Sequence, residues 1–584
     1  MTLTQSDAVV DSPPKDRPSR WEGRRWAGLP LPIVLYAILG ILVLVPVGFV
    51  LLAAFTDAPP RPGSIGEAGF TLTNFGALFT PGAISASINS LLVGVGSSIV
   101  GLLIGGFLAF ITARSNVYLR RFLYLVGLMP LFLPSYVGAL AWAILGSPNS
   151  GLINVLARDL GLPTIVDIYN IGGLIFVLGI FYAPYAFLMI HGSFTLMSSE
   201  LEEAGGVHGA TPGGVLRRVT FPLALPAILG SAILIFTLTI ENFPVARIIG
   251  AAGRVDTLPT YIYRLMTSSP SRGNEAAAVA IILVLVVLAV TYGQRRLLAK
   301  RNYTTVAGKG VRAGVIDLGR FRLPALLIAL LYFLVATVLP IVALLFVSLH
   351  DLPFIGTVTG AFSGNAFSFG SFVELFQSDV LASATFNSIV VSILAAAIGT
   401  ALAFVTAYVV NRTKVPGRAG LEYVSILPLA VPSIVLGLGL LWTWLVLPIP
   451  IYGTLAVLVV TFIAAQLPQG FRGVASSILQ VDRDLEDSAV MHGASRAKAV
   501  ARITLPLMRI GLTSTFLLLL MLSMRELTVA LFLFTTDTRL LSIVIFDDYD
   551  NGILQRSATT SLLYCVIIFA LAIAARRFGA KEQV

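Results

Sequence analysis

Charged residues are scarce in this chain of 584 residues, and their scarcity excludes an ordinary soluble protein. Only 12% of the residues are charged, whereas 57% are hydrophobic and the mean hydropathy is +0.90. Soluble globular proteins carry about 25% charged residues. The composition therefore indicates that lipid surrounds most of the chain, which makes membrane lipid an expected partner.

Cysteine and histidine are also nearly absent. The single cysteine, Cys565, excludes a disulfide within the chain and lies in an apolar run, which favours a packing role. The four histidines are spread over the sequence at His191, His208, His350 and His492. Their separation gives no histidine metal site, so metal binding stays unknown at this stage.

A phosphate-binding loop is missing as well. Such a loop needs a Gly-Lys pair followed by Ser or Thr. None of the six lysines has this context: Lys15, Lys300, Lys309, Lys414, Lys498 and Lys581. The chain is therefore expected to hydrolyse no ATP and to hold no cofactor of its own.

What the chain does contain is a series of long apolar runs, each about the length that crosses a bilayer. We predict twelve spans, at 31–55, 90–113, 122–145, 171–190, 225–249, 276–293, 323–349, 386–410, 420–444, 451–467, 510–534 and 557–575. The third and ninth runs are rich in proline, which predicts kinks. The expected fold class is an all-α polytopic membrane protein.

The two halves of the chain repeat one another. Pro130 and Pro134 match Pro428 and Pro432 at an offset of 298 residues, as do the Asn-Ser pairs at 89–90 and 387–388. The offset falls to 284 further along, so the first half has about 14 extra residues near 146–170. This predicts a polar N-terminal arm (1–28), a first six-helix half (29–293), a linker (294–322) and a second half (323–584), related by a pseudo-two-fold axis.

Lysine and arginine predict the orientation. With the N-terminus inside and the spans alternating, the inside segments hold 30 of the 39 basic residues. Six spans in each half put both halves in the same orientation, so the repeat is parallel and both termini lie in the cytoplasm. The same bias accounts for the net charge of +10 without any nucleic-acid partner.

A polar loop occurs twice, with matched positions 284 residues apart. The first copy includes Glu202, Glu203, Ala204, His208, Gly209, Val219, Phe221 and Pro222. The second includes Glu486, Asp487, Ala489, His492, Gly493, Ile503, Leu505 and Pro506.

In each copy, acidic residues open a short amphipathic segment and a glycine permits a sharp turn. We expect a second short helix to follow and the proline to end it. A solvated loop would explain one copy. Two cytoplasmic copies with the same glycine and proline spacing favour a docking element.

These loops resemble the EAA loop of ABC importer permeases, whose pattern is Glu-Ala-Ala, three residues, Gly, nine residues, Ile, any residue, Leu-Pro. The first copy departs from it at Gly205, Val219 and Phe221, and the second at Asp487 and Ser488, each by a mild change. The resemblance implies a permease of the bacterial cytoplasmic membrane in which both loops couple to ATPase subunits. It also implies two copies of an ABC ATPase, with ATP and Mg²⁺ bound there, and an extracytoplasmic binding protein.

The substrate is less well specified. The run 301–310 and the segments 525–527 and 541–547 resemble fused permeases for ferric iron, whereas thiamine, polyamine and phosphonate permeases share the broader pattern. An ion-driven secondary transporter would explain spans and repeats but not paired docking loops. A channel or a membrane scaffold is a further, less favoured alternative.

Charged residues within spans are expensive in lipid and mark candidate pathways. The pairs Glu241-Asn242 and Arg525-Glu526 have near-equivalent places in the two halves, with Glu241 nineteen residues after Pro222 and Glu526 twenty residues after Pro506. They line a pathway, or they form an intramembrane Glu–Arg pair that stabilises the bundle. A further set of acidic and phenolic residues has two possible roles. It could supply hard oxygen ligands for a ferric ion, or it could consist of solvated loop residues that meet a binding protein. The residues are Asp547, Asp548, Asp550, Tyr261, Tyr263 and Tyr549.

Overall fold

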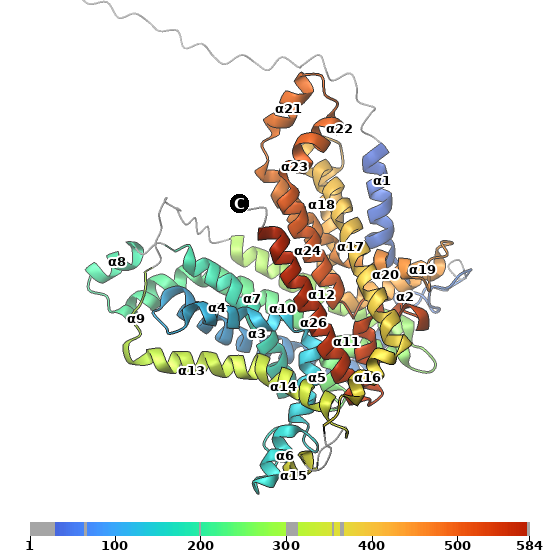
Figure 1. The fold of residues 1–584 in the computed structure, drawn as a ribbon. Coiled ribbons are helices and arrows are strands. Elements are labelled where there is room, and N and C mark those ends of the chain that lie inside the picture. Colours follow the sequence, from blue (N-terminus) through green and yellow to red (C-terminus); the bar gives the residue numbers. More distant parts are fainter. Residues whose placement is uncertain are drawn as a thin grey trace, which may run out of the picture.

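The computed structural model describes residues 30–63, 67–197, 200–299, 314–352, 356–362 and 367–580. The predicted N-terminal arm and residues 300–313 of the linker lie outside these ranges. Within them, nine helices are long and apolar enough to cross a membrane, or up to twelve if three bent pairs each count as one span. The predicted all-helical membrane fold is therefore confirmed (Figure 1).

Helices of unequal length build the first half. They are α1 (Pro30–Leu39), α2 (Val45–Ala54), α3 (Pro81–Arg114), α4 (Arg120–Leu128), α5 (Ser135–Gly146), α6 (Leu152–Asp159), α7 (Ile171–Thr195), α8 (Glu200–Val207), α9 (Pro212–Val215), α10 (Phe221–Ile240), α11 (Leu258–Thr267) and α12 (Gly273–Ala299).

The second half repeats this order with additional short helices. They are α13 (Arg322–Phe333), α14 (Leu339–Leu349), α15 (Val358–Ala361), α16 (Gly370–Gln377), α17 (Asp379–Arg412), α18 (Arg418–Ile426), α19 (Ser433–Val446), α20 (Leu455–Gln480), α21 (Arg483–Met491), α22 (Arg496–Ala499), α23 (Leu505–Leu507), α24 (Arg509–Arg525), α25 (Leu541–Asp550) and α26 (Leu554–Ala580).

The proline-rich third and ninth spans are broken rather than merely kinked. The chain bends by 93° between Arg120–Phe132 and Ser135–Gly146, and by 114° between Arg418–Ala430 and Ser433–Val446. Pro134 and Pro432 stand at these breaks, where each precedes the second helix of its pair with an extended ψ. A proline lacks the N–H that would continue the first helix.

The fifth and eleventh spans end earlier than the apolar pattern predicts. Helix α10 ends at Ile240 and α24 at Arg525, whereas the expected spans run to 249 and 534. The last residues of the two expected spans form the short turns η5 (Ala246–Gly250) and η10 (Ala530–Phe532), and α11 and α25 follow outside the predicted spans. We call this end of the molecule, formed by residues 241–272 and 526–556, the far end.

The first span of each half packs against the opposite half. The Tyr36 hydroxyl donates a hydrogen bond to the carbonyl of Gly417, and that of Tyr332 donates to the carbonyl of Ile180 at 3.1 Å. A Cβ added to Gly439 of α19 would lie 2.4 Å from the carbonyl oxygen of Pro46 in α2. Both large buried clusters accordingly mix the two halves, so the halves are interlocked.

Small residues allow the long helices to approach closely. A Cβ on Gly105 of α3 would lie 2.4 Å from the carbonyl oxygen of Ala183 in α7. Without a hydrophobic driving force between helices in lipid, such close backbone packing supplies much of the association. Helices α3 and α7 thus form a firm pair in the first half.

Candidate functional site

The repeated loops adopt the same fold. In the first, α8 is followed by Gly209 and the short helix α9, and in the second α21 is followed by Gly493 and α22. The N–H of Ala210 donates to the carbonyl of Gly205, and that of Ala494 to the carbonyl of Ala489, both at 3.0 Å. Figure 1 shows α8–α9 and α21–α22 as separate projections.

Both loop glycines occupy the left-handed region of backbone space. Gly209 has φ +80° and Gly493 has φ +88°. No atom lies within 4 Å of the position that a Cβ would take at either glycine. The reason for glycine is therefore the backbone conformation and not a lack of space.

Pro222 does not end the second short helix of the first loop, contrary to the sequence prediction, whereas in the second loop the helix ends at Leu507, one residue after Pro506. A π-helical turn, η4 (Leu216–Thr220), leads directly from α9 into α10, whose first turn contains Pro222. In the second copy η9 (Val500–Thr504) leads into α23, and the chain bends by 73° only after Pro506. Thr220 and Thr504 have helical backbone angles, so each proline lies inside a continuous helix, directly after a π-helical turn. Prolines and π-helical turns are both places where the backbone hydrogen-bond pattern of a helix is interrupted.

The predicted loop residues differ in exposure. Glu203, Ala204, His208, His492 and both glycines are exposed at the projecting ends. The apolar positions before the prolines are partly buried, except for Phe221, which is 50% exposed. The side chain of Glu202 lies outside what the structure describes.

The second loop carries an ionic network. Asp487 lies 2.7 Å from Arg496 and 3.7 Å from Arg483, and Arg496 also lies 3.7 Å from Glu486. Burial opposes the charge of Arg496, but the two carboxylates outweigh it and raise the pKa of the guanidinium. Pro212 stands in the first loop where Arg496 stands in the second, so the two loops are electrostatically different.

Sequence reasoning missed two pairs of matched loop residues. Val207 and Met491, which are 284 residues apart, are each 85% exposed. Thr211 and Ser495 cap the second short helices, with oxygen-to-nitrogen distances of 3.2 and 3.3 Å. The equal spacing was the available signal for both pairs. Each loop therefore exposes one apolar side chain at its tip.

The pathway candidates lie just past helix ends. Glu241 is the C-cap of α10, and Glu526 is the C-cap of α24, where its carboxylate accepts the N–H of Val529 at 3.1 Å. Asn242 donates to the Tyr182 hydroxyl at 2.7 Å.

No Glu–Arg ion pair forms among these candidates. Within the described ranges, no carboxylate lies within 4.0 Å of the Arg525 guanidinium. The offset of 284 moreover pairs Glu241 with Arg525, and Asn242 with Glu526. The two glutamates are thus near-equivalent, one residue out of register with each other.

The acidic residues near the end of the chain are not a solvated loop, as one sequence reading expected, because α25 contains them. Asp548 is 3% exposed and accepts a hydrogen bond of 2.8 Å from Arg556, while Asp550 pairs with Arg247 at 3.0 Å. No group of three or more His, Cys, Asp or Glu side chains that could hold a metal ion occurs in the described part of the chain.

The repeated Asn-Ser pair fastens the far end to the long helices. In the first half, Asn89 donates to the carbonyl of Asp256 at 2.9 Å, and Ser90 accepts the N–H of Leu258, the first residue of α11, at 2.7 Å. In the second half, Asn387 donates to the carbonyl of Asp537 at 3.1 Å, and Ser388 accepts the N–H of Leu541 at 2.8 Å.

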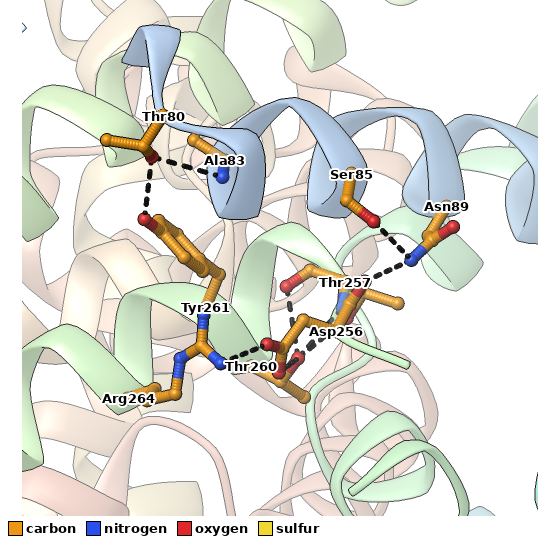
Figure 2. Close-up of polar contacts among 9 residues, drawn as sticks. All are labelled: Thr80, Ala83, Ser85, Asn89, Asp256, Thr257, Thr260, Tyr261 and Arg264. Atoms are coloured by element: carbon orange, nitrogen blue, oxygen red, sulfur yellow. Dashed lines mark hydrogen bonds and ion pairs between the residues drawn. The ribbon is translucent and has the colours of Figure 1, made fainter. Parts of the chain in front are cut away.

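Further contacts attach α11 to the start of α3. Figure 2 shows the Tyr261 hydroxyl pointing at Thr80, with 3.0 Å between the two oxygens, and Arg264 reaching Asp256 at 2.7 Å. Hydrogen bonds therefore attach α11 to α3 and α25 to α17.

Comparison with known proteins gives one family and several distant relatives. The family model described as binding-protein-dependent transport system inner membrane component matches residues 101–302 and 399–581. A putative ferric transport system permease of Haemophilus influenzae is 24% identical over 76% of this chain and 69% of its own length. A ferric transport system permease of Actinobacillus pleuropneumoniae is 24% identical over 79% of this chain and 65% of its own.

Solved structures resemble the chain more weakly. A bacterial ABC transporter involved in the import of the acidic polysaccharide alginate is 22% identical, with a TM-score of 0.35, over 45% of this chain and 96% of that one.

Proposed function

Because this chain belongs to the family of binding-protein-dependent transport system inner membrane components, we propose that its two repeated loops are the docking sites of two copies of a separate ATPase. The chain is the permease of an ABC importer and is not itself catalytic. The family implies that a partner ATPase uses ATP. The observation that carries the docking proposal is the pair of projecting loops with the same glycine turn and an equally exposed apolar tip.

Orientation follows from this assignment. The loops and both termini face the cytoplasm of a bacterium, and the far end faces outward, where the binding protein delivers its ligand. ATP binding draws the two ATPases together and moves the loops. The halves 29–293 and 323–584, joined by the linker 294–322, then rock between inward-open and outward-open states. ATP binding drives this change because it favours one state over the other.

Ferric iron is the substrate that we propose. Its support is the naming of the two relatives above as ferric transport permeases, together with the family resemblance of the runs at 301–310 and 525–527. A permease passes its substrate on, so a resident site of three or more metal ligands is not required. Thiamine, a polyamine or a phosphonate would use the same machine.

The loop-tip side chains provide the test. Val207→Glu with Met491→Glu places two charges where an apolar contact is expected, and should abolish both co-purification of the ATPase and uptake of radiolabelled ferric iron. Val315→Glu is the matched control, since Val315 is an exposed apolar residue of the linker, with 58% exposure. Its neighbour Ile316 donates its N–H to the carbonyl of Arg114, the last residue of α3, at 2.8 Å. In the proposed orientation Val315 therefore lies on the same side of the membrane as the repeated loops.

The results separate the hypotheses. Loss of the ATPase in the double variant but not in the control supports docking at the tips. An ATPase that remains bound to the double variant at wild-type stoichiometry would refute it. If no ATPase accompanies the wild-type complex in mild detergent and an ion gradient alone drives uptake, a secondary transporter is the better description.

A further inference from the structure

Segments from the two halves meet at the far end of the molecule. They are η5 (Ala246–Gly250), which follows α10, and α25. Nη2 of Arg247 lies 3.0 and 3.2 Å from the two carboxylate oxygens of Asp550. The neighbouring Tyr549 hydroxyl donates to the carbonyl of Ile248 at 3.0 Å. Two adjacent residues of one half therefore hold two adjacent residues of the other.

Aromatic rings continue the same seam. The ring centres of Phe243 and Phe546 are 5.9 Å apart, and those of Tyr263 and Phe532 are 6.0 Å apart, so each pair joins the two halves. The guanidinium carbon of Arg247 lies 5.7 Å from the ring centre of Tyr263. The Arg247–Asp550 ion pair thus lies beside a small aromatic cluster that joins the two halves.

Each side of the seam is attached firmly to its own half. The pairs Asn89-Ser90 and Asn387-Ser388 fasten the starts of α11 and α25 to α3 and α17. Figure 2 shows the bond between Asn89 and Asp256. A motion that separates α3 from α17 at the far end would carry α11 and α25 with them. Such a motion would draw η5 away from α25 and so break the contacts between the halves.

We propose that Arg247–Asp550 and the Tyr549–Ile248 hydrogen bond form a latch that closes the far end between the halves, and that this latch opens in every transport cycle before a ligand enters. This rests on the proposed function. The energetics suit such a role. The Arg247 and Asp550 side chains are 30% and 40% exposed, and partly exposed ion pairs stabilise proteins little. A contact of this kind can reverse in each cycle, whereas a buried pair would resist separation.

The latch predicts a specific effect on the resting ATPase rate. Removing a contact made only in the closed state shifts the population toward the open state. Arg247→Ala and Asp550→Ala should each raise several-fold the ATPase rate of the purified complex, measured without binding protein. The exchange Arg247→Asp with Asp550→Arg should bring the rate back toward wild type.

An ion pair that stays within one half gives the matched control. Arg272, the last residue of the far end, precedes α12 and pairs with Glu275 in the first turn of that helix, with side chains 47% and 26% exposed. Arg272→Ala should leave the resting ATPase rate unchanged. Wild-type rates in both latch variants, or an exchange variant as fast as the single variants, would overturn the latch while the docking assignment stands. A wild-type complex without a bound ATPase would instead refute the proposed function.

Cross-linking tests the same idea without relying on a rate increase. Arg247→Cys with Asp550→Cys, in a Cys565→Ala background, should react with a short reducible bis-thiol linker. Uptake should stop on cross-linking and return after the linker is reduced. Uptake that continues in the fully cross-linked protein would show that the halves do not separate at this point.

Discussion

The hydroxyl of Tyr408 donates a hydrogen bond of 2.8 Å to the carboxylate of Glu486, which is only 1% exposed. The other oxygen of the same carboxylate accepts the hydroxyl of Thr504 at 2.7 Å. The Glu486 carboxylate thereby joins α17 to α21 and, through Thr504, ties α21 to η9 at the end of the second loop. At the offset of 298 the first half has Phe110, which has no hydroxyl, so this link belongs to the second loop.

Tyr408→Phe should therefore weaken the second loop selectively. A hydrogen bond to a charged group contributes about 1.5–3 kcal/mol, and its loss leaves a buried carboxylate oxygen with one partner fewer. We expect faster proteolysis between α21 and α22 and a partial loss of uptake. Tyr423→Phe, at a tyrosine that is 75% exposed, is the control. Equal proteolysis rates in the two variants would contradict the link.

The loop glycines make a second prediction, which depends on backbone conformation. Since a Cβ at Gly209 or Gly493 would meet no atom within 4 Å, the cost of a substitution is the positive φ, about 1–2 kcal/mol for an ordinary L residue. Gly209→Val with Gly493→Val should insert normally but lose ATPase docking and uptake, because β-branched residues tolerate this conformation least.

Asparagine provides the control for this conformational argument, since it visits the left-handed region more readily than other residues. Gly209→Asn with Gly493→Asn should keep most of the uptake. Each single valine variant should be partly active, because two docking sites share the load. Normal uptake in the double valine variant would be inconsistent with a coupling role.

Much of the fold could be predicted from the sequence because lipid imposes a strong pattern. The length and position of most spans follow from apolar runs such as 31–55, and the bends follow from Pro134 and Pro432. The ends of the fifth and eleventh spans could not be predicted. The runs 243–250 and 527–534 are largely apolar and so extend the hydrophobic pattern, but the structure folds them into short turns.

The position and the shared fold of the two loops could be predicted because the same residue spacing occurs twice, which a chance pattern would not give. The partners of single residues were not readable. The acidic residues of the second loop are adjacent in the sequence, yet Glu486 is buried against Tyr408 from a distant helix while Asp487 binds Arg496. Contacts across the halves, such as Arg247 with Asp550, are 303 residues apart and leave no local signal.

A buried asparagine explains how the extra residues of the first half are ordered. The side chain of Asn154 is 0% exposed and makes four hydrogen bonds. It donates to the carbonyls of Ser147 and Val166 at 2.9 and 2.6 Å, and accepts the N–H groups of Ile165 and Val166 at 2.9 and 3.0 Å. One amide thus closes the segment 147–166 into a compact unit.

Asn154→Ala should unfold this unit locally, because it removes four hydrogen bonds to the backbone, and a buried group left without a partner costs about 1–3 kcal/mol. The Ser147 carbonyl keeps the N–H of Gly151 as a partner, so the loss falls mainly on residues 165–166. Limited proteolysis from the outer side should then cut within 156–166 at least ten times faster. Asn551→Ala is the control, since Asn551 is exposed and bonds only within its own helical turn. An unchanged cleavage rate in Asn154→Ala would contradict this account.

The final prediction concerns the two charges at the end of α24. Glu526 accepts the N–H of Val529 at 3.1 Å, and glutamine retains an oxygen that can accept the same bond. No ion pair joins Glu526 to Arg525 among the described residues. Neither Glu526→Gln nor Arg525→Gln should therefore incur the cost of about 3–5 kcal/mol that follows when one partner of a buried pair is removed.

Glu526→Gln should give an assembled complex with the wild-type melting temperature but with reduced uptake, while its ATPase activity persists in part. This combination is expected if the carboxylate faces the passing substrate, because only the charge that meets the substrate is lost. Glu241→Gln should behave in the same way, and Arg525→Gln measured in parallel reports on the adjacent cation. A purely structural role for Glu241 and Glu526 would be the better description after either of two outcomes. In the first, Glu241→Gln and Glu526→Gln both fail to accumulate in the membrane. In the second, both variants transport at the wild-type rate.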